Sequence, residues 1–314
     1  MEVLRDGMDR VPEGTATAVS VGSYDGIHRG HHAVLTTLCG LAGERGLAPA
    51  VVTFDQHPAA VVRPENAPLL LTDHEQRREL FTAIGLEYLF LLAFDEQRAQ
   101  MSSREFVEQV LVDTMNARLI VVGQNFHFGK GRSGSVDSLR ELGDELGFEV
   151  VGLDLFGDEN AVEPISSTAI RRALAGGEIE AVTTLLGRRY EVRGEVVEGD
   201  QRGRLIGFPT ANIAFAPGRA WPAKGVYSAW AVLPDGRRVP AAVNIGFRPT
   251  FEQHAETPLL EAHLIDFDED LYGQQLRVEF ATFLRSEQRF SGIDEIATQL
   301  KKDVEAARAA LEAA

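Results

Sequence analysis

The sequence of 314 residues predicts an α/β N-terminal domain with a doubly wound parallel sheet, followed by an all-β C-terminal domain. Over the first half, short β-branched apolar runs alternate with helical patterns, as in a parallel sheet buried on both faces. Near residue 186 the pattern changes to short runs of period two, divided by glycine and proline. We therefore expect one domain at residues 1–185 and a second at 186–314.

In the first domain, strands and helices are expected to follow one another regularly. Strands are predicted at 15–21, 49–54, 88–94, 118–123 and 148–155, and helices at 32–42, 72–85, from 102, at 138–146 and from 167. Thr72 and Glu75 have the spacing of a capping box and predict the start of the second helix. Strands that alternate with helices in this way imply right-handed βαβ units.

In the second domain, about six short antiparallel strands predict a small six-stranded barrel. The turn Pro234–Asp235–Gly236 between two of the runs is typical of a hairpin. A terminal helix closes the chain, and Ser291 and Asp294 are its predicted caps.

Composition limits the classes of partner. The chain carries 31 Lys and Arg against 47 Asp and Glu, a net charge of −16, which disfavours nucleic acid. No apolar run reaches the ~20 residues that span a bilayer, and the charged N-terminus lacks the apolar core of a signal peptide. The single cysteine, Cys39, fits a reducing compartment. We expect a cytoplasmic protein that acts on small molecules, with no nucleic-acid or membrane partner; a homo-oligomer is left open.

A first candidate site lies in V-S-V-G-S-Y-D-G-I-H-R-G-H-H-A, residues 19–33, where a predicted strand passes into a helix. Gly22 and Gly26 allow backbone to approach a phosphate closely, and helix N-termini at this edge of a sheet bind anions. His28 and His31 are three residues apart and point the same way on a first helical turn. The pattern leaves open a zinc site, an exposed polar turn, or two donors to phosphate oxygens.

Two further segments are expected at the same sheet edge. G-Q-N-F-H-F-G-K-G-R-S-G (123–134) follows the fourth strand, and I-S-S-T-A-I-R-R (165–172) follows the fifth. Arginines at a helix start oppose the helix dipole unless an anion binds there. Three anion-friendly segments after three strands favour the phosphate interpretation.

G-S-Y-D-G-I-H-R-G-H, G-Q-N-F-H-F-G and I-S-S-T-A-I-R resemble the motifs of prokaryotic FAD synthetases, within the H-x-G-H nucleotidyltransferase superfamily. The resemblance implies a Rossmann-like nucleotidyltransferase domain that joins AMP to FMN. It places His28 and His31 at the ATP phosphates, with Asn125 orienting them. It also implies phosphate contacts by Gly22, Asp25, Ser167, Thr168 and Arg171, and flavin contacts by Phe54, Phe126 and Phe128. The family often has Phe at Tyr24, Pro at Gln56 and Asp at Asn125; an asparagine can position a phosphate but cannot act as a base.

A second candidate site lies in G-R-L-I-G-F-P-T-A-N-I, residues 203–213. In an extended segment Thr210 and Asn212 point to the same side, and a hydroxyl with an amide oxygen suits Mg²⁺. The alternative is a glycine–proline turn that leads into a strand.

G-F-P-T-A-N is similar to the signature of riboflavin kinases, and G-V-Y-S, N-I-G-F-R-P-T-F and L-E-A-H-L-I-D-F-D-E-D-L-Y-G follow in the family's order. The resemblance implies that Glu261 takes the proton from the riboflavin 5′-hydroxyl, and that Thr210 and Asn212 hold Mg²⁺. Backbone of Gly203 and Gly207 would cover ATP. Arg285 would contact the flavin or pair with a carboxylate.

Together the resemblances imply a bifunctional enzyme that converts riboflavin to FMN and FMN to FAD, with ATP and Mg²⁺ in both steps. No nucleophile stands among the first-domain motifs, so direct in-line transfer is expected. Two alternatives remain at this point: an adenylyltransferase with a non-catalytic second domain, and a flavin-binding storage or regulatory protein.

Overall fold

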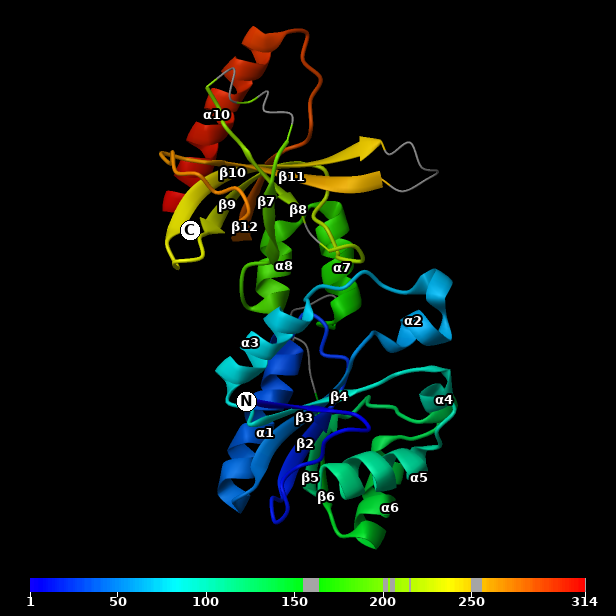
Figure 1. Ribbon diagram of the computed structural model, residues 1–314. Coiled ribbons are helices and arrows are strands. Elements are labelled where there is room, and N and C mark those ends of the chain that lie inside the picture. The colour runs from blue at the N-terminus through cyan, green and yellow to red at the C-terminus, as the bar shows by residue number, and fades with distance from the viewer. Residues whose placement is uncertain (155–163, 200–202, 204–206, 215, 250–255, 314) are drawn as a thin grey trace. The chain divides into compact units, whose positions relative to one another are not determined.

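The computed structural model describes residues 1–154, 164–199, 203, 207–214, 216–249 and 256–313. The chain divides into two compact units, Met1–Ser167 and Thr168–Ala314, which Figure 1 shows as a sheet with helices and a barrel. The boundary expected at residue 185 stays a prediction.

The first unit is built on a sheet of six parallel strands in the order β1-β4-β3-β2-β5-β6. The strands are β1 (Glu2–Arg5), β2 (Thr17–Val21), β3 (Ala48–Phe54), β4 (Tyr88–Leu92), β5 (Ala117–Gly123) and β6 (Glu149–Leu153). The predicted parallel sheet is confirmed, with one strand more than expected. β1 has no apolar run that would predict it, because it is a short edge strand with a charged residue at each end.

Helices cover both faces of this sheet (Figure 1). On one face pack α1 (Arg29–Arg45) and α3 (His74–Ile84); on the other pack α5 (Ser103–Phe106), the π-helical η2 (Val107–Thr114) and α6 (Val136–Leu146). Val51 belongs to the core under α1 and α3, whereas its neighbours Ala50 and Val52 belong to the opposite core. This alternation is why the strands read as continuous apolar runs. Shorter helices are α2 (Pro58–Val62), η1 (Pro64–Asn66), α4 (Glu96–Ala99) and η3 (Lys130–Arg132).

The strand order reverses beside β2. From β2 the chain moves outward to β3 and β4, then returns to place β5 on the other side of β2. Open α/β sheets bind ligands beyond the carboxyl ends of the strands at such a reversal. A ligand-binding site is therefore expected at the loops that follow β2 and β5.

The predicted start of α3 was wrong by one residue. Asp73, not Thr72, is the N-cap, and Gln76 completes the capping box. The Thr72 hydroxyl instead accepts a hydrogen bond from the Gly26 amide at 3.0 Å. The Thr72 side chain, which the local spacing predicted to cap the helix, thus makes a long-range contact to the loop after β2 instead.

The second unit is a closed barrel of antiparallel neighbours in the order β10-β11-β8-β7-β12-β9, which confirms the predicted architecture. Its strands are β7 (Glu191–Val197), β8 (Ala211–Ala214), β9 (Gly225–Val232), β10 (Arg238–Pro249), β11 (Glu256–Leu264) and β12 (Gln275–Arg285). Helices α7 (Ser167–Gly176) and α8 (Ile179–Leu186) precede the barrel, and α10 (Ile293–Glu312) follows it. Ser291 and Asp294 do not cap α10: its N-cap is Gly292, and Ser291 donates to Glu295 instead.

An ion pair attaches α10 to the barrel. The Arg285 guanidinium donates to both carboxylate oxygens of Asp303, at 2.8 and 2.6 Å. The two side chains are 18% and 5% exposed, so the pair is largely withdrawn from water. The side-chain amide of Gln299 also donates to Asp303. Arg285 therefore has a structural partner at the end of β12.

Asp303→Asn is expected to lower the free energy of unfolding of the barrel by about 3 kcal/mol, since it leaves a mostly buried guanidinium without its charge partner. Both tryptophans, Trp221 and Trp230, lie in this unit, so urea unfolding followed by tryptophan fluorescence reports on it alone. Asp266→Asn is the matched control, because Asp266 pairs with Arg308 of α10 but is 74% exposed; its effect should stay within about 0.5 kcal/mol. Equal effects of the two substitutions would contradict the prediction.

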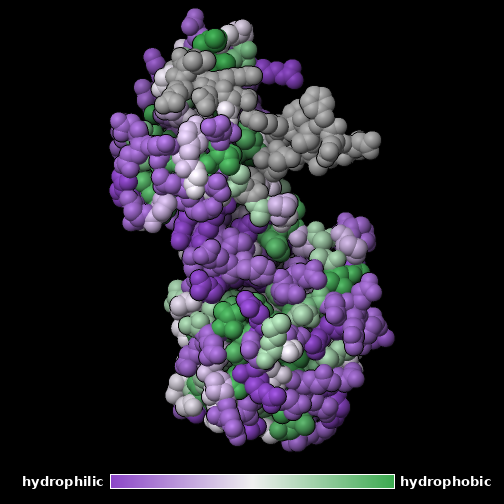
Figure 2. Space-filling view, viewed as in Figure 1, coloured by the Kyte–Doolittle hydropathy of each residue, from purple (hydrophilic) through white to green (hydrophobic). Residues whose placement is uncertain are grey.

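No helix in the described part of the chain is long and apolar enough to cross a bilayer. The face drawn in Figure 2 is mainly hydrophilic, with small separate apolar areas.

Candidate active sites

The loop after β2 has an unusual backbone that its neighbours hold in place. Tyr24 and Ile27 have positive φ angles of 47° and 38°, which non-glycine residues adopt only when their surroundings require it. The Asp25 carboxylate, 3% exposed, accepts hydrogen bonds from the amides of Leu71 (2.9 Å) and Thr72 (3.1 Å). Asp25 thus fastens the loop to the segment before α3.

Arg77 of α3 is a second anchor, which no sequence motif indicated. Its guanidinium, on a side chain 8% exposed, donates to the carbonyls of Ser23 (3.3 Å) and Phe54 (3.4 Å). These residues lie just beyond β2 and at the end of β3. Arg77 therefore joins two loops that carry candidate site residues.

His28 and His31 lie stacked at the start of α1, with ring centroids 3.6 Å apart and planes inclined by 17°. His28 is the N-cap, and its Nδ1 accepts a hydrogen bond from the His31 amide at 3.3 Å. An accepting Nδ1 places the proton of the neutral ring on Nε2. Burial, and next the neighbouring His28, hold the pKa of His31 well below its ordinary value, so this ring is neutral near pH 7.

Tyr24 supports the histidine pair from the side. Its ring meets that of His31 edge-on at a centroid distance of 5.0 Å. The Ser20 hydroxyl donates to the Val121 carbonyl, so the Tyr24 hydroxyl must donate to Ser20, and this buried polar group is satisfied. Burial raises the pKa of Tyr24, against the smaller effect of the Ser20 hydrogen bond. A Cβ at Gly22 would come within 3.0 Å of this ring, which explains the glycine.

A cavity of about 440 Å³ opens between the loops after β2 and β5, where the strand order reverses. Gly22 and His31 border it from the β2 side, and Asn125 and Phe126 from the β5 side. The remaining lining residues are Val21, Ser23, Tyr24, Val34, Gly123, Gln124 and Asp154. His31 Nδ1 is buried and has no hydrogen-bond partner within the described part of the chain.

The other first-site candidates, among them His28, are not among the residues that line this cavity. Phe128 is buried beneath Phe126, with ring centroids 5.4 Å apart, and Phe54 contacts Phe94. The Ser167 hydroxyl donates to the Asp25 carbonyl at 2.8 Å. Thr168 and Arg171 follow on α7, within the second unit. The alternative of a zinc site has no support among the described residues, which contain no group of three or more His, Cys, Asp or Glu that could hold a metal ion.

A second cavity, of about 410 Å³, lies at the barrel. Thr210 and Asn212 both border it. The other lining residues are Val196, Pro209, Ala211, Ala262, Leu264, Phe267, Asp268, Glu269, Asp270, Leu271 and Tyr272. Asn212 is 6% exposed, and its Oδ1 is buried with no hydrogen-bond partner among the residues described. An orphaned amide oxygen beside a hydroxyl fits a hard cation.

Glu261 is not among these lining residues, but it stands directly opposite Asn212 in the register of β11 and β8. Residues opposite each other in an antiparallel pair have their side chains on the same face. Asn212 therefore connects the cavity with the strand face that carries Glu261.

The G-F-P-T-A-N segment is held by close backbone contacts. The Phe208 amide donates to the Gly203 carbonyl at 2.9 Å, and a Cβ at Gly203 would lie 2.3 Å from the Phe208 oxygen. A Cβ at Gly199 would lie 2.1 Å from Asn212 Nδ2, so the Asn212 amide rests against glycine backbone. Gly207 has a φ of 83°, a conformation that favours glycine.

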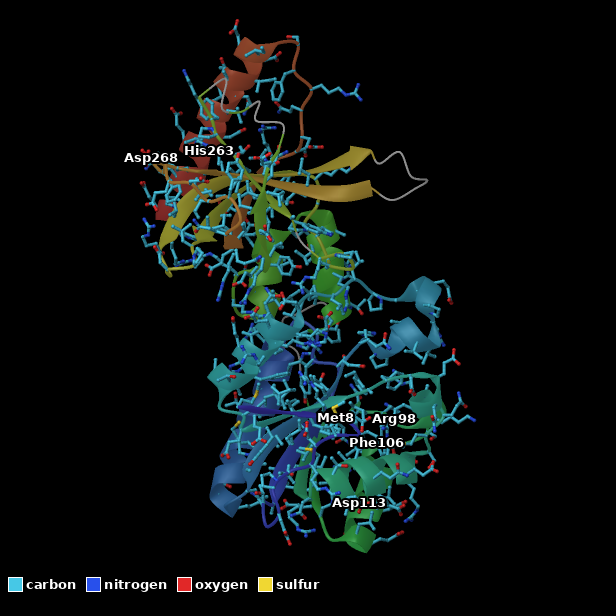
Figure 3. All side chains as sticks on the ribbon, viewed as in Figure 1. Met8, Arg98, Phe106, Asp113, His263 and Asp268 are labelled. Atoms are coloured by element: carbon cyan, nitrogen blue, oxygen red, sulfur yellow. The ribbon has the colours of Figure 1, made fainter. Side chains whose placement is uncertain are left out.

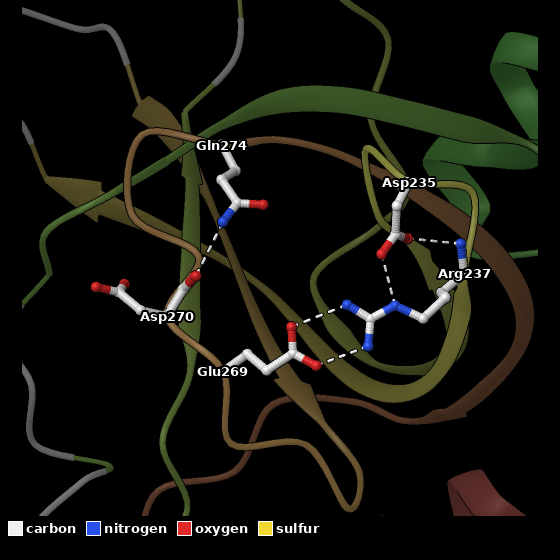
Figure 4. A network of polar contacts seen from close by, with 5 residues as sticks. All are labelled: Asp235, Arg237, Glu269, Asp270 and Gln274. Carbon is white, nitrogen blue, oxygen red and sulfur yellow. Dashed lines mark hydrogen bonds and ion pairs between the residues drawn. The ribbon is translucent and has the colours of Figure 1, made fainter.

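The loop after β11 completes the second cavity, and Figure 4 shows what fixes it. Arg237, from the hairpin between β9 and β10, donates to the two carboxylate oxygens of Glu269 at 2.6 and 2.8 Å. Its Nε also donates to Asp235 at 2.6 Å, and the Gln274 side chain donates to the Asp270 carbonyl at 2.9 Å. Three acidic side chains of this loop border the cavity, Asp268, Glu269 and Asp270, and the charge of Glu269 is thereby neutralised.

Two family models match the chain: FAD synthetase over residues 11–169 and riboflavin kinase over residues 186–311. The bifunctional riboflavin kinase/FMN adenylyltransferase of Escherichia coli K12 is 35% identical over 290 residues, which is 92% of this chain and 91% of that protein. The chain belongs to this family. The bifunctional riboflavin kinase/FMN adenylyltransferase of Pseudomonas fluorescens is 37% identical over 311 residues, 98% of this chain and 97% of that one.

Among solved structures, a crystal structure described as a macrolide-efflux protein from Streptococcus pneumoniae has a TM-score of 0.88 and 29% identity, covering 98% of this chain and 99% of that one. The chain is thus similar in sequence to these two relatives, and in fold to the solved structure, over more than 90% of its length.

Proposed function

We propose that the barrel unit phosphorylates riboflavin to FMN with ATP, and that the α/β unit transfers AMP from a second ATP to FMN, giving FAD and pyrophosphate. One observation carries the proposal: each of the two segments that match a family model has a cavity of its own, and motif residues of that segment border it. The substrates are small molecules, and the −16 net charge supports the absence of a nucleic-acid partner.

In the kinase step, Glu261 accepts the proton of the riboflavin 5′-hydroxyl. The oxygen forms a bond to the γ-phosphorus of ATP while the bond from that phosphorus to the bridging oxygen breaks, and ADP leaves. Thr210 and the orphaned Oδ1 of Asn212 would hold Mg²⁺, which offsets phosphate charge when bound. Backbone of Gly203 and Gly207 covers the nucleotide. We assign Arg285 to the Asp303 ion pair and not to the flavin.

In the adenylyl transfer, an FMN phosphate oxygen attacks the α-phosphorus of ATP and pyrophosphate leaves. His28 and His31 donate N–H groups to the phosphates as charge moves onto the leaving pyrophosphate. Asn125 and the backbone of Gly22 position the phosphates, and the family resemblance adds Ser167, Thr168 and Arg171. Phe54, Phe126 and Phe128 serve the flavin, with Phe128 acting from beneath Phe126. Asp25 acts through the loop that it fastens.

Incubation with riboflavin, ATP and Mg²⁺, followed by chromatography of the flavins, tests the proposal. FMN should appear first and FAD after it, with pyrophosphate released in step with FAD. FMN without FAD would overturn the role of the α/β unit. Binding of FMN without either product would favour a flavin-storage protein.

Gly199→Ala is expected to reduce riboflavin phosphorylation about tenfold or more, because the added methyl group displaces the Asn212 amide. FMN adenylylation, measured with FMN supplied, should be unchanged. Gly292→Ala is the control within the same unit, since a Cβ there meets nothing within 4 Å. If Gly199→Ala retains the wild-type rate, the placement of Asn212 does not matter for phosphoryl transfer.

A further inference from the structure

His263 forms a hydrogen bond with the backbone immediately before the proposed metal ligands. It lies on β11, two residues after Glu261, and Figure 3 labels it together with Asp268 of the following loop. Its Nδ1 is 2.8 Å from the Pro209 carbonyl oxygen. Since a carbonyl oxygen only accepts hydrogen bonds, Nδ1 carries the proton and donates it.

The strand register explains why this side chain reaches that carbonyl. In the β11–β8 pair, Glu261 stands opposite Asn212 and Ala262 opposite Ala211. Continuing this register one step past the start of β8 brings His263 level with Thr210, which precedes the strand. The imidazole also meets the Phe208 ring edge-on, at a centroid distance of 5.4 Å. A single side chain therefore contacts both residues that precede Thr210.

The segment depends on such a contact because regular pairing begins only after it. β8 starts at Ala211, and Pro209 has no N–H to give to a neighbouring strand. The Pro209 carbonyl is thus the group through which the turn can be held against β11. Its position determines where the chain enters β8 and hence where the Thr210 hydroxyl lies.

We propose that His263 is a positioning residue of the riboflavin kinase site. Its Nδ1–H holds the Pro209 carbonyl, and the Phe208 ring holds the imidazole, so that Thr210 and Asn212 present their oxygens together. The inference rests on the proposed function of the barrel. His263 itself touches no reacting atom; it acts through the backbone of Pro209.

Two substitutions separate the donor from the ring. His263→Phe keeps an aromatic ring against Phe208 and removes the donor, whereas His263→Asn restores an N–H at the place of Nδ1. With His263→Phe, the Mg²⁺ concentration for half-maximal riboflavin phosphorylation should rise about three- to tenfold, the range of one net hydrogen bond, while the KM for riboflavin stays constant. His263→Asn should recover most of this loss. FAD formation from FMN by the same chain is the internal control.

Hydrogen–deuterium exchange supplies a readout that needs no activity. Residues 207–214 should exchange faster in His263→Phe than in the wild type or His263→Asn, with β12 unaffected. Unchanged exchange and Mg²⁺ dependence in His263→Phe would overturn the inference, as would equal losses in both variants. A wild-type chain that makes no FMN would overturn the proposed kinase function instead, and the exchange comparison would still decide the role of His263.

Discussion

Replacing Glu261 by glutamine should lower the rate of riboflavin phosphorylation by about 10²–10⁴-fold, the range that a positioned general base contributes. Glutamine has the size of glutamate and can accept a hydrogen bond from the 5′-hydroxyl, but it cannot take the proton. The rate should therefore fall with little change in the KM for ATP. Adenylylation of supplied FMN should proceed at the wild-type rate.

A second carboxylate shows whether the effect belongs to this position. Glu279 lies on β12 of the same barrel and pairs with Arg238. Glu279→Gln should leave phosphorylation unchanged, while Glu261→Asp, which keeps the carboxylate but shortens its reach, should retain part of the rate. A Glu261→Gln protein with the wild-type rate would mean that Glu261 is only a polar residue of an alternating strand.

Much of the architecture could be predicted from the sequence because it depends on local patterns. Continuous apolar strands reflect a sheet with a core on each face, as Val51 and its neighbours show. Period-two runs reflect a barrel with an inside and an outside. The prediction of the α3 cap was wrong because Thr72 binds Gly26, 46 residues away in the sequence. Local spacing cannot report a contact of that range.

The residues that support the two sites were harder to predict from the sequence, because they too act through long-range contacts. Gly199 is needed only because the Asn212 amide rests on it, and Arg77 acts on carbonyls of two other loops. The partner of Arg285, left open by the sequence, is Asp303 on α10. For His263 a signal was present, since it is two residues from Glu261 on an alternating strand. Nothing in the sequence indicated the strand register that places His263 beside Pro209.

Replacing His28 by asparagine should reduce FAD formation from FMN by about 10²–10³-fold, the usual effect of removing one donor to developing charge. The substitution is chosen for the geometry of α1. The His28 Nδ1 caps the helix by accepting from the His31 amide, and the asparagine Oδ1 can take over that bond. What is lost is the N–H at Nε2. Riboflavin phosphorylation in the same sample should not change.

His28→Gln tests the opposite case, in which the N–H donor is kept and the helix cap is lost. Glutamine can place an N–H near the position of Nε2, although it gives up the helix cap. It should be more active in FAD formation than His28→Asn, while urea unfolding should show it to be the less stable of the two. Were activity to follow stability instead, with His28→Asn the more active, His28 would serve α1 as its cap and not ATP as a phosphate donor.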